Sequence, residues 1–111
     1  MTVKEMAEKL NLKLLAGEAG TSHEIKGCYI GDLLSWAMSR CVEGDVWITV
    51  MGNLNAIAVS TLADAACIIL VDSAELDEDA RQRAEQQEVP VYSTDQTAFQ
   101  TAVRVKELLP E

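Results

Sequence analysis

The sequence predicts an α/β fold in which a mostly parallel central sheet, built from repeated strand-helix units, is covered by helices on both faces as a three-layer structure. From Val46 onward, an apolar, β-branched run alternates with a helical pattern three times. Such alternation implies parallel strands joined by crossover helices. The run Cys67 to Val71 lacks apolar-polar alternation, as expected of a central strand buried on both faces. At 111 residues, of which 49% are hydrophobic, the chain predicts one domain spanning residues 1–111.

The first part of the chain predicts a short helix and a strand ahead of these repeats. Thr2 and Glu5 have the spacing of a capping box. A helical face is predicted for the apolar residues that follow at the matching intervals, which are Val3, Met6, Ala7 and Leu10. A strand from Leu12 to Leu15, a glycine-containing loop and a short extended piece near Ile25 come next.

A second helix is predicted after Gly31, with Asp32 as its N-cap residue. Its apolar positions are Leu33, Leu34, Trp36, Ala37 and Met38. Because apolar residues fall on more than one side of this helix, we expect more than one side to be covered. Residues 43–45 then form a turn.

Three strand-helix units fill the rest of the chain. The predicted strands are VWITV, CIILV and VPVYS, and the helices that follow them run from about Asn55 to Ala65, over LDEDARQRAEQQ, and over DQTAFQTAVRVKELL. Residues 77–79 place negative charge in the first turn of the second of these helices, with Asp77-Arg81 and Asp79-Arg83 as expected i,i+4 pairs. For the last helix, Ser93 and Gln96 have capping-box spacing.

Composition argues against several classes of partner. Eighteen acidic and nine basic residues give a net charge of -9, and the basic residues form no stripe that could follow phosphates, so nucleic acid is not an expected partner. No apolar run approaches the roughly 20 residues of a membrane span, and no signal-peptide core is visible, so we expect a cytoplasmic protein without membrane contact. A solvated acidic surface is the plainer interpretation of the charge; a basic partner protein is the alternative.

The sequence offers no visible catalytic apparatus. Cys28, Cys41 and Cys67 form neither a disulfide framework nor a zinc pattern, and His23 lies alone in a polar loop. Neither a P-loop nor the G-x-G-x-x-G dinucleotide fingerprint occurs. We therefore predict no catalytic residues, no metal and no cofactor, keeping a small hydrolase that uses Cys28 or Asp72 only as a remote alternative.

Candidate ligand-binding residues follow the three predicted parallel strands. Parallel α/β sheets bind ligands beyond the carboxyl ends of their strands, where backbone N-H groups at helix starts face outward. The residues at these positions are Gly52, Asn53, Asn55, Asp72, Ser73, Thr94 and Asp95. Short polar residues also occur there simply to cap helices, so capping alone and a ligand site both remain open interpretations.

Three segments, GCYIGDLLSWAM, GDVWITVMGNLNAIAVSTLADAACIILV and VPVYSTDQTAFQTAVRV, resemble in this order a stand-alone DRTGG-domain protein. The resemblance implies an α/β domain similar to the N-terminal domain of HPr kinase/phosphorylase, acting as an accessory module. The Asp-Arg-Thr-Gly-Gly motif itself does not occur, and Gly52-Asn53-Leu54 stands where some relatives carry Gly-Asp-Arg.

Together these features predict a non-catalytic regulatory or sensor domain that binds a small polar ligand at the strand ends and acts through self-association. A homodimer is suggested by Trp36, Trp47 and Met51, which a small chain does not readily bury. The alternative is a scaffold or assembly subunit that binds no ligand and docks a basic partner, such as a partner enzyme, through residues 77–88.

Overall fold

Five strands form one sheet in the order β1-β5-β4-β3-β2. The computed structural model describes residues 1–110. The strands are β1 (Lys13–Ala16), β2 (Gly27–Ile30), β3 (Asp45–Thr49), β4 (Cys67–Leu70) and β5 (Val91–Ser93). Strands β2 to β5 are parallel and β1 is antiparallel to β5, which confirms the predicted mostly parallel sheet. Residues of the CIILV run form β4, the central strand, as predicted.

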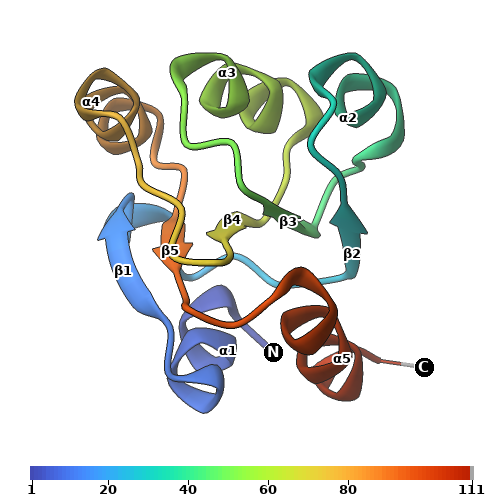
Figure 1. Cartoon of the computed structure of the whole chain (residues 1–111). Helices are drawn as coiled ribbons and strands as arrows, with labels where there is room; N and C mark the ends of the chain where they lie inside the picture. Colours follow the sequence, from blue (N-terminus) through green and yellow to red (C-terminus); the bar gives the residue numbers. More distant parts are fainter. Residues whose placement is uncertain (111) are drawn as a thin grey trace.

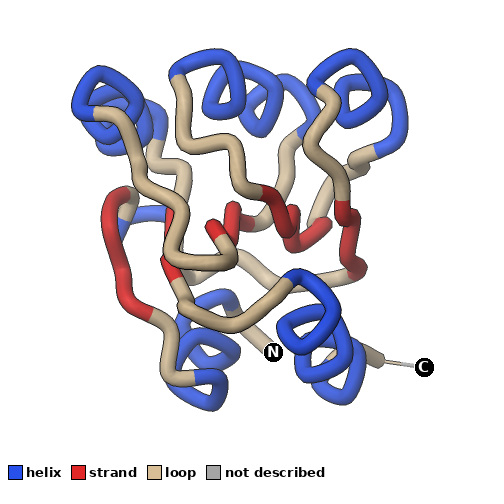
Figure 2. The backbone as a smooth tube through the Cα atoms, viewed as in Figure 1, coloured by secondary structure: helices blue, strands red, loops and turns tan. Residues whose placement is uncertain are grey.

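Helices cover both faces of the sheet, so the predicted three layers are confirmed. In Figure 1, α2, α3 and α4 lie on one face, and α1 and α5 lie on the other. Figure 2 shows the strands as the middle layer between these two groups. The helices are α1 (Val3–Leu10), α2 (Leu34–Arg40), α3 (Leu54–Ala63), α4 (Glu78–Gln87) and α5 (Ala98–Leu108), with a 3-10 turn η1 (Glu18–Gly20) after β1. None of the helices within residues 1–110 has the length and apolar character needed to cross a bilayer.

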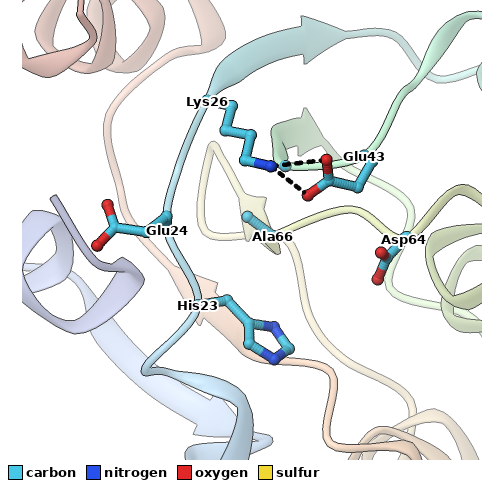
Figure 3. A pocket seen from close by; sticks show the side chains of 7 residues that line it. His23, Glu24, Lys26, Glu43, Asp64 and Ala66 are labelled. Atoms are coloured by element: carbon cyan, nitrogen blue, oxygen red, sulfur yellow. Dashed lines mark hydrogen bonds and ion pairs between the residues drawn. The ribbon is translucent and has the colours of Figure 1, made fainter.

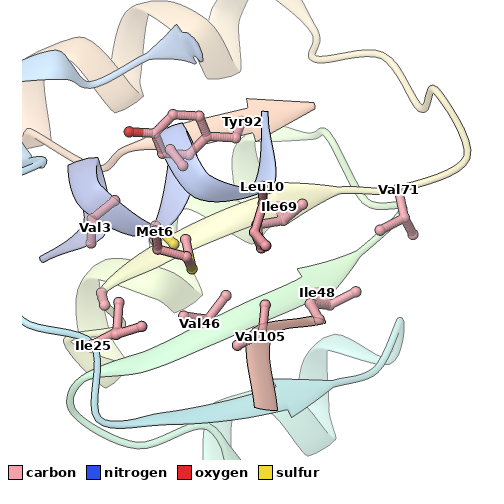
Figure 4. Packing of buried hydrophobic residues seen from close by; sticks show 13 residues of the cluster. Val3, Met6, Leu10, Ile25, Val46, Ile48, Ile69, Val71, Tyr92 and Val105 are labelled. Carbon is pink, nitrogen blue, oxygen red and sulfur yellow. The ribbon is translucent and has the colours of Figure 1, made fainter. Parts of the chain in front are cut away.

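Two hydrophobic clusters hold the layers together, one on each face of the sheet. Met6 and Leu10 of α1 pack with Val105 of α5 against Ile48 and Ile69 of the sheet (Figure 4). Trp47, Ile68 and Leu70 point to the other face, where small residues of α2, α3 and α4 meet them. Each fully buried aliphatic side chain contributes about 1.5–3 kcal/mol. The strand interiors therefore fix the frame on which the loops are held.

Strand β2 and the start of α2 differ from the prediction. The sequence suggested only an extended piece near Ile25, whereas Gly27–Ile30 pairs with β3 in a parallel register, so a fourth strand-helix unit precedes the predicted three. The prediction that Asp32 caps α2 is wrong, because Leu33 occupies the N-cap position without a side-chain bond. Asp32 Oδ1 accepts hydrogen bonds from Thr49 Oγ1 and the Val50 N-H instead.

Other predicted helix details also change. The capping box of α1 at Thr2 and Glu5 is confirmed. For α5 the box is formed by Thr97 and Gln100, and the prediction of Ser93 and Gln96 is wrong because Ser93 still belongs to β5.

Charge pairing on α4 also differs from the two expected i,i+4 pairs. The ion pair of this helix joins Glu78 to Arg81 at 2.7 Å instead.

Only part of the aromatic argument for self-association holds. Trp47 is fully buried and its Nε1 donates to the Gly31 carbonyl at 3.0 Å, so it offers no contact surface. Trp36 is 54% exposed, with the Arg40 guanidinium 4.1 Å from its ring centre. Met51 is half-buried beside the second cluster.

Candidate functional site

Four loops meet at the carboxyl ends of the parallel strands, and we call this surface the carboxyl rim. It consists of residues 31–33, 50–53, 71–77 and 94–97, which follow β2, β3, β4 and β5. Backbone hydrogen bonds join neighbouring loops: the Asp77 N-H donates to the Gly52 carbonyl at 2.8 Å, and the Ser73 N-H donates to the Thr94 carbonyl at 2.9 Å. The structure thus brings together the loops that carry most of the predicted residues.

Gly52 lies at the closest approach between two of these loops. A Cβ atom at this position would overlap the carbonyl oxygen of Glu75 and come within 2.9 Å of the Glu75 carbonyl carbon. Both obstacles are backbone atoms, which cannot swing aside as a side chain does. Gly52 is therefore needed for the close packing of the loop after β3 against the loop after β4.

The two asparagines of the loop after β3 have different roles. Asn53 Oδ1 accepts from the Ala56 N-H at 2.9 Å, which makes Asn53 the N-cap of α3. Asn55 is exposed in the first turn of α3 and makes no hydrogen bond to the other rim loops within the described residues. Asn53 is thus committed to capping, while the side chain of Asn55 faces solvent.

Asp72 and Ser73 form an unusual turn after β4. Their φ angles are 54° and 57°, so two successive non-glycine residues occupy the left-handed region. This conformation directs the Asp72 N-H to the Gln96 carbonyl and the Ser73 N-H to the Thr94 carbonyl, both at 2.9 Å. The hydrogen bonds offset the local strain, and both side chains remain exposed to solvent.

The loop after β5 completes the rim. Thr94 Oγ1 accepts from the Gln96 N-H at 3.2 Å, and the Asp95 carboxylate accepts from Gln96 Nε2 at 3.3 Å. Asp95 is exposed and its second carboxylate oxygen is free to accept from a ligand.

Sequence reasoning missed two residues that organise the rim. Asp32 Oδ1 accepts from Thr49 Oγ1 at 2.7 Å and from the Val50 N-H at 2.9 Å, and Thr49 Oγ1 in turn accepts from the Met51 N-H. Thr49 is 1% exposed, so its hydroxyl depends on Asp32 for an acceptor. The missed signal was the short run Cys28 to Ile30 followed by Gly31 and Asp32, which identifies β2 as a strand with a rim loop of its own.

Charge at the rim has a single sign. Its four segments contain five carboxylates and neither lysine nor arginine; the acidic residues are Asp32, Asp72, Glu75, Asp77 and Asp95. The N-termini of α2, α3, α4 and α5, which begin directly after these segments, add only partial positive charges. The rim therefore attracts cations and opposes polyanions, most strongly at low ionic strength.

A hollow lies at the opposite, amino end of the strands (Figure 3). It encloses about 260 Å³ between the segment before β2 and the turns before β3 and β4. Lys26 Nζ donates to both carboxylate oxygens of Glu43, at 2.8 and 2.9 Å, so its charge is already paired. Among residues 1–110, no three His, Cys, Asp or Glu side chains gather to form a metal site.

The three thiols are unsuited to nucleophilic chemistry. All are free cysteines. Burial, with a smaller effect of the Asp45 charge, raises the pKa of Cys28 to about 11 and that of Cys41 to about 12. Burial also raises the pKa of Cys67, which lies in the core as expected. At neutral pH each thiol is protonated and therefore a weak nucleophile.

Comparison with solved structures finds a related fold. The crystal structure of the CBS and DRTGG domains of the regulatory region of Clostridium perfringens pyrophosphatase, complexed with the activator diadenosine tetraphosphate, matches with a TM-score of 0.73 and 12% sequence identity. The match covers 98% of this chain and 47% of that chain, so this chain spans about half of the pyrophosphatase regulatory fragment. A search of the curated proteins finds no significant match.

Comparison with family models gives the assignment. The model described as the DRTGG domain matches residues 5–108, which include all five strands, helices α2 to α5 and all of α1 except its first two residues. The predicted resemblance to DRTGG-domain proteins is thereby confirmed, although the Asp-Arg-Thr-Gly-Gly sequence is absent. The chain belongs to the DRTGG domain family.

Proposed function

We propose that this DRTGG domain is a non-catalytic regulatory module that binds a small polar ligand on its carboxyl rim and acts through self-association. The regulatory part of the proposal is supported by the pyrophosphatase structure, in which a DRTGG domain forms part of a regulatory region. The ligand part rests on the rim geometry of this chain.

The observation that carries the proposal is the joining of loops from neighbouring strands into one surface. The bonds from Asp77 to Gly52 and from Ser73 to Thr94 connect the ends of β3, β4 and β5. A ligand held by the exposed side chains of Ser73 and Asp95 would touch two of these loops at once. Binding would then stabilise all the loops together, which is the coupling that a sensor requires.

Rim charge defines the class of ligand. Five carboxylates without a basic residue favour an amine, a polyamine or an uncharged polar molecule over a nucleoside polyphosphate or an acyl phosphate. The diadenosine tetraphosphate of the pyrophosphatase structure belongs to a fragment about twice as long as this chain. We therefore propose a cationic or neutral ligand for this rim.

Thermal unfolding in the presence of small molecules tests this proposal. The probes are spermidine, neutral amino acids and uncharged nucleosides, with ATP and acetyl phosphate as polyanionic contrasts. A probe present at 100 times its Kd stabilises the folded chain by about 2.7 kcal/mol, which raises Tm by about 10 °C for a chain of this size. Polyanions are expected to give no increase.

Matched variants locate the binding site. Asp95→Asn removes one exposed carboxylate from the rim, whereas Glu43→Gln removes one from the opposite end of the sheet. The increase in Tm should shrink in Asp95→Asn and persist in Glu43→Gln. The proposal fails if no probe stabilises the chain, or if the Glu43→Gln variant is the one that loses the effect.

The acidic helix α4, which would dock the basic partner of a scaffold protein, gives the scaffold alternative less support. Glu78 of α4 is paired with Arg81, and Glu85 Oε1 accepts from the Gly17 N-H at 2.9 Å, so neither carboxylate is freely available to a basic partner. Charge reversal at the exposed Asp79 is the cleaner test, because reversing Glu85 would also remove the hydrogen bond to the β1 turn. Loss of a recovered partner protein in Asp79→Lys would favour the scaffold.

A further inference from the structure

Strand β2 has an open backbone edge. It pairs only with β3, and its residues are half-buried or exposed while those of β3 and β4 are buried. The Gly31 N-H donates to the Ile48 carbonyl, so odd-numbered residues of this segment bond inward. Because hydrogen-bonding directions alternate along a strand, the N-H and C=O groups of Cys28 and Ile30 point outward from the sheet.

The two edges of the sheet are protected very differently. At the opposite edge, β1 begins with Lys13 and its register shifts between Leu14 and Ala16, and both features discourage pairing with another strand. β2 (Gly27–Ile30) contains no charge and no proline, and its four residue pairs with β3 follow without a shift. An uncharged, regular, open strand is a template for a further strand.

Exposed apolar side chains flank this open strand. Ile30 is 51% exposed. Its register partner Ile48 packs on the sheet face covered by α1 and α5, so the side chain of Ile30 belongs to that same face. On α5, Arg104 Nη2 donates to the Lys9 carbonyl of α1, and Phe99 lies about 140° around the helix from Arg104, on a flank turned away from α1. Phe99 is 76% exposed. Trp36 of α2, whose helix lies on the other face near β2 in Figure 1, is 54% exposed.

Charge distribution identifies the occupant of this edge. Residues 26–43 and 98–108, which include Glu43 as the ion-pair partner of Lys26, carry a net charge of +1, since four basic residues (Lys26, Arg40, Arg104, Lys106) outnumber three acidic ones (Asp32, Glu43, Glu107). The chain as a whole carries -9, so the remaining residues carry -10. Two copies of the chain would repel each other through most of their surface, and the β2 side is where they can meet without that repulsion.

We propose that two copies of this chain pair edge to edge through antiparallel β2 strands, which joins their sheets into one sheet across a two-fold axis. The proposal rests on the self-association in the proposed function and names its interface. In an antiparallel pair, the residues whose backbone N-H and C=O groups point outward from each sheet must lie opposite one another. Pairing Cys28 of one copy with Ile30 of the second gives the longest overlap and places the two-fold axis at Tyr29. A standard dimer interface covers about 800 Å² per copy, roughly one-eighth of the 5977 Å² that this chain exposes.

Cross-linking tests the register. With the axis at Tyr29, the two Tyr29 Cα atoms lie about 4.5 Å apart, within the range of a disulfide. The two Cys28 Cα atoms lie about 8 Å apart, beyond that range. In a Cys28→Ala background, Tyr29→Cys should form a disulfide-linked dimer on oxidation, whereas the natural chain, with its half-buried Cys28, should not. Absence of the Tyr29→Cys cross-link overturns this register.

Sedimentation equilibrium tests the edge itself. Ile30→Lys places a charge opposite Cys28 of the second copy and should weaken the dimer about 100-fold, because each copy loses one apolar contact. Leu62→Lys, which replaces a 75% exposed residue of α3 by the same side chain, is the control and should remain dimeric. If Ile30→Lys remains as dimeric as the control, the β2 edge is wrong while self-association stands. A natural chain that is monomeric at high concentration overturns both the β2 interface and self-association. Ligand binding at the rim is tested separately, by thermal unfolding.

Discussion

Replacement of Gly52 by alanine is the sharpest probe of the carboxyl rim. The added Cβ would overlap the Glu75 carbonyl oxygen, and the loops could part only by breaking the 2.8 Å hydrogen bond from the Asp77 N-H to the Gly52 carbonyl. Overpacking costs about 1–3 kcal/mol, and a lost backbone hydrogen bond adds about 0.5–1.5 kcal/mol. We therefore expect Gly52→Ala to lower the free energy of unfolding by about 2–4 kcal/mol, a large part of a typical total of about 5–15 kcal/mol.

Gly31→Ala is the matched control, because it makes the same change on the same rim. There the added Cβ would lie 2.8 Å from the Tyr29 hydroxyl, the far end of a side chain that can rotate away. We expect a cost below about 1 kcal/mol for this variant. Urea unfolding followed by circular dichroism distinguishes the two variants. In thermal unfolding, Tm should fall by about 10–20 °C for Gly52→Ala alone. Equal stability of the two variants would refute the close loop packing.

Three further outcomes follow from the rim and the core. Asn53→Ala should cost about 1 kcal/mol in urea unfolding because the N-cap of α3 is lost, while Asn55→Ala, two residues along, should cost less than about 0.5 kcal/mol. Asp32→Ala should cost about 1–3 kcal/mol, because a buried threonine hydroxyl loses its acceptor; a neutral result in the same assay would contradict the network. Burial raises the pKa of Cys41 and Cys67, so the protonated thiols contribute fully to the free energy of unfolding below the ordinary thiol pKa, and this contribution is lost as pH rises. Above about pH 9, the free energy of unfolding should fall by about 1.4 kcal/mol for each pH unit and for each of the two thiols. The fall should be less steep in Cys41→Ala, which has one buried thiol fewer.

Patterns that depend on burial could be predicted from the sequence. The uninterrupted run from Cys67 placed the central strand because only a strand covered on both faces tolerates such a sequence. Met6 and Leu10 identified the buried face of α1 because helical spacing survives in a short amphipathic segment. β2 was missed because a short edge strand that contains glycine buries too little to produce either pattern.

Local polar choices could not be predicted, since they depend on neighbours far along the chain. Asp32 has the residue type and position of an N-cap, but Thr49 at the end of β3 and Val50 just after it offer Asp32 hydrogen bonds that the helix start does not. The start of α5 moved past Gln96 because its carbonyl accepts from the Asp72 N-H. Both outcomes are set by tertiary contacts, which override local propensity.

An NMR titration tests the central claim most directly. A compound that raises Tm would be added to isotope-labelled chain while the backbone amide resonances are followed. We expect the shifts to concentrate on Gly52, Ser73, Thr94 and Asp95, with Lys26 and Asp64 at the opposite end of the sheet unchanged. Shifts centred on the hollow around Lys26, with the rim resonances unmoved, would contradict a ligand site at the carboxyl ends of the strands.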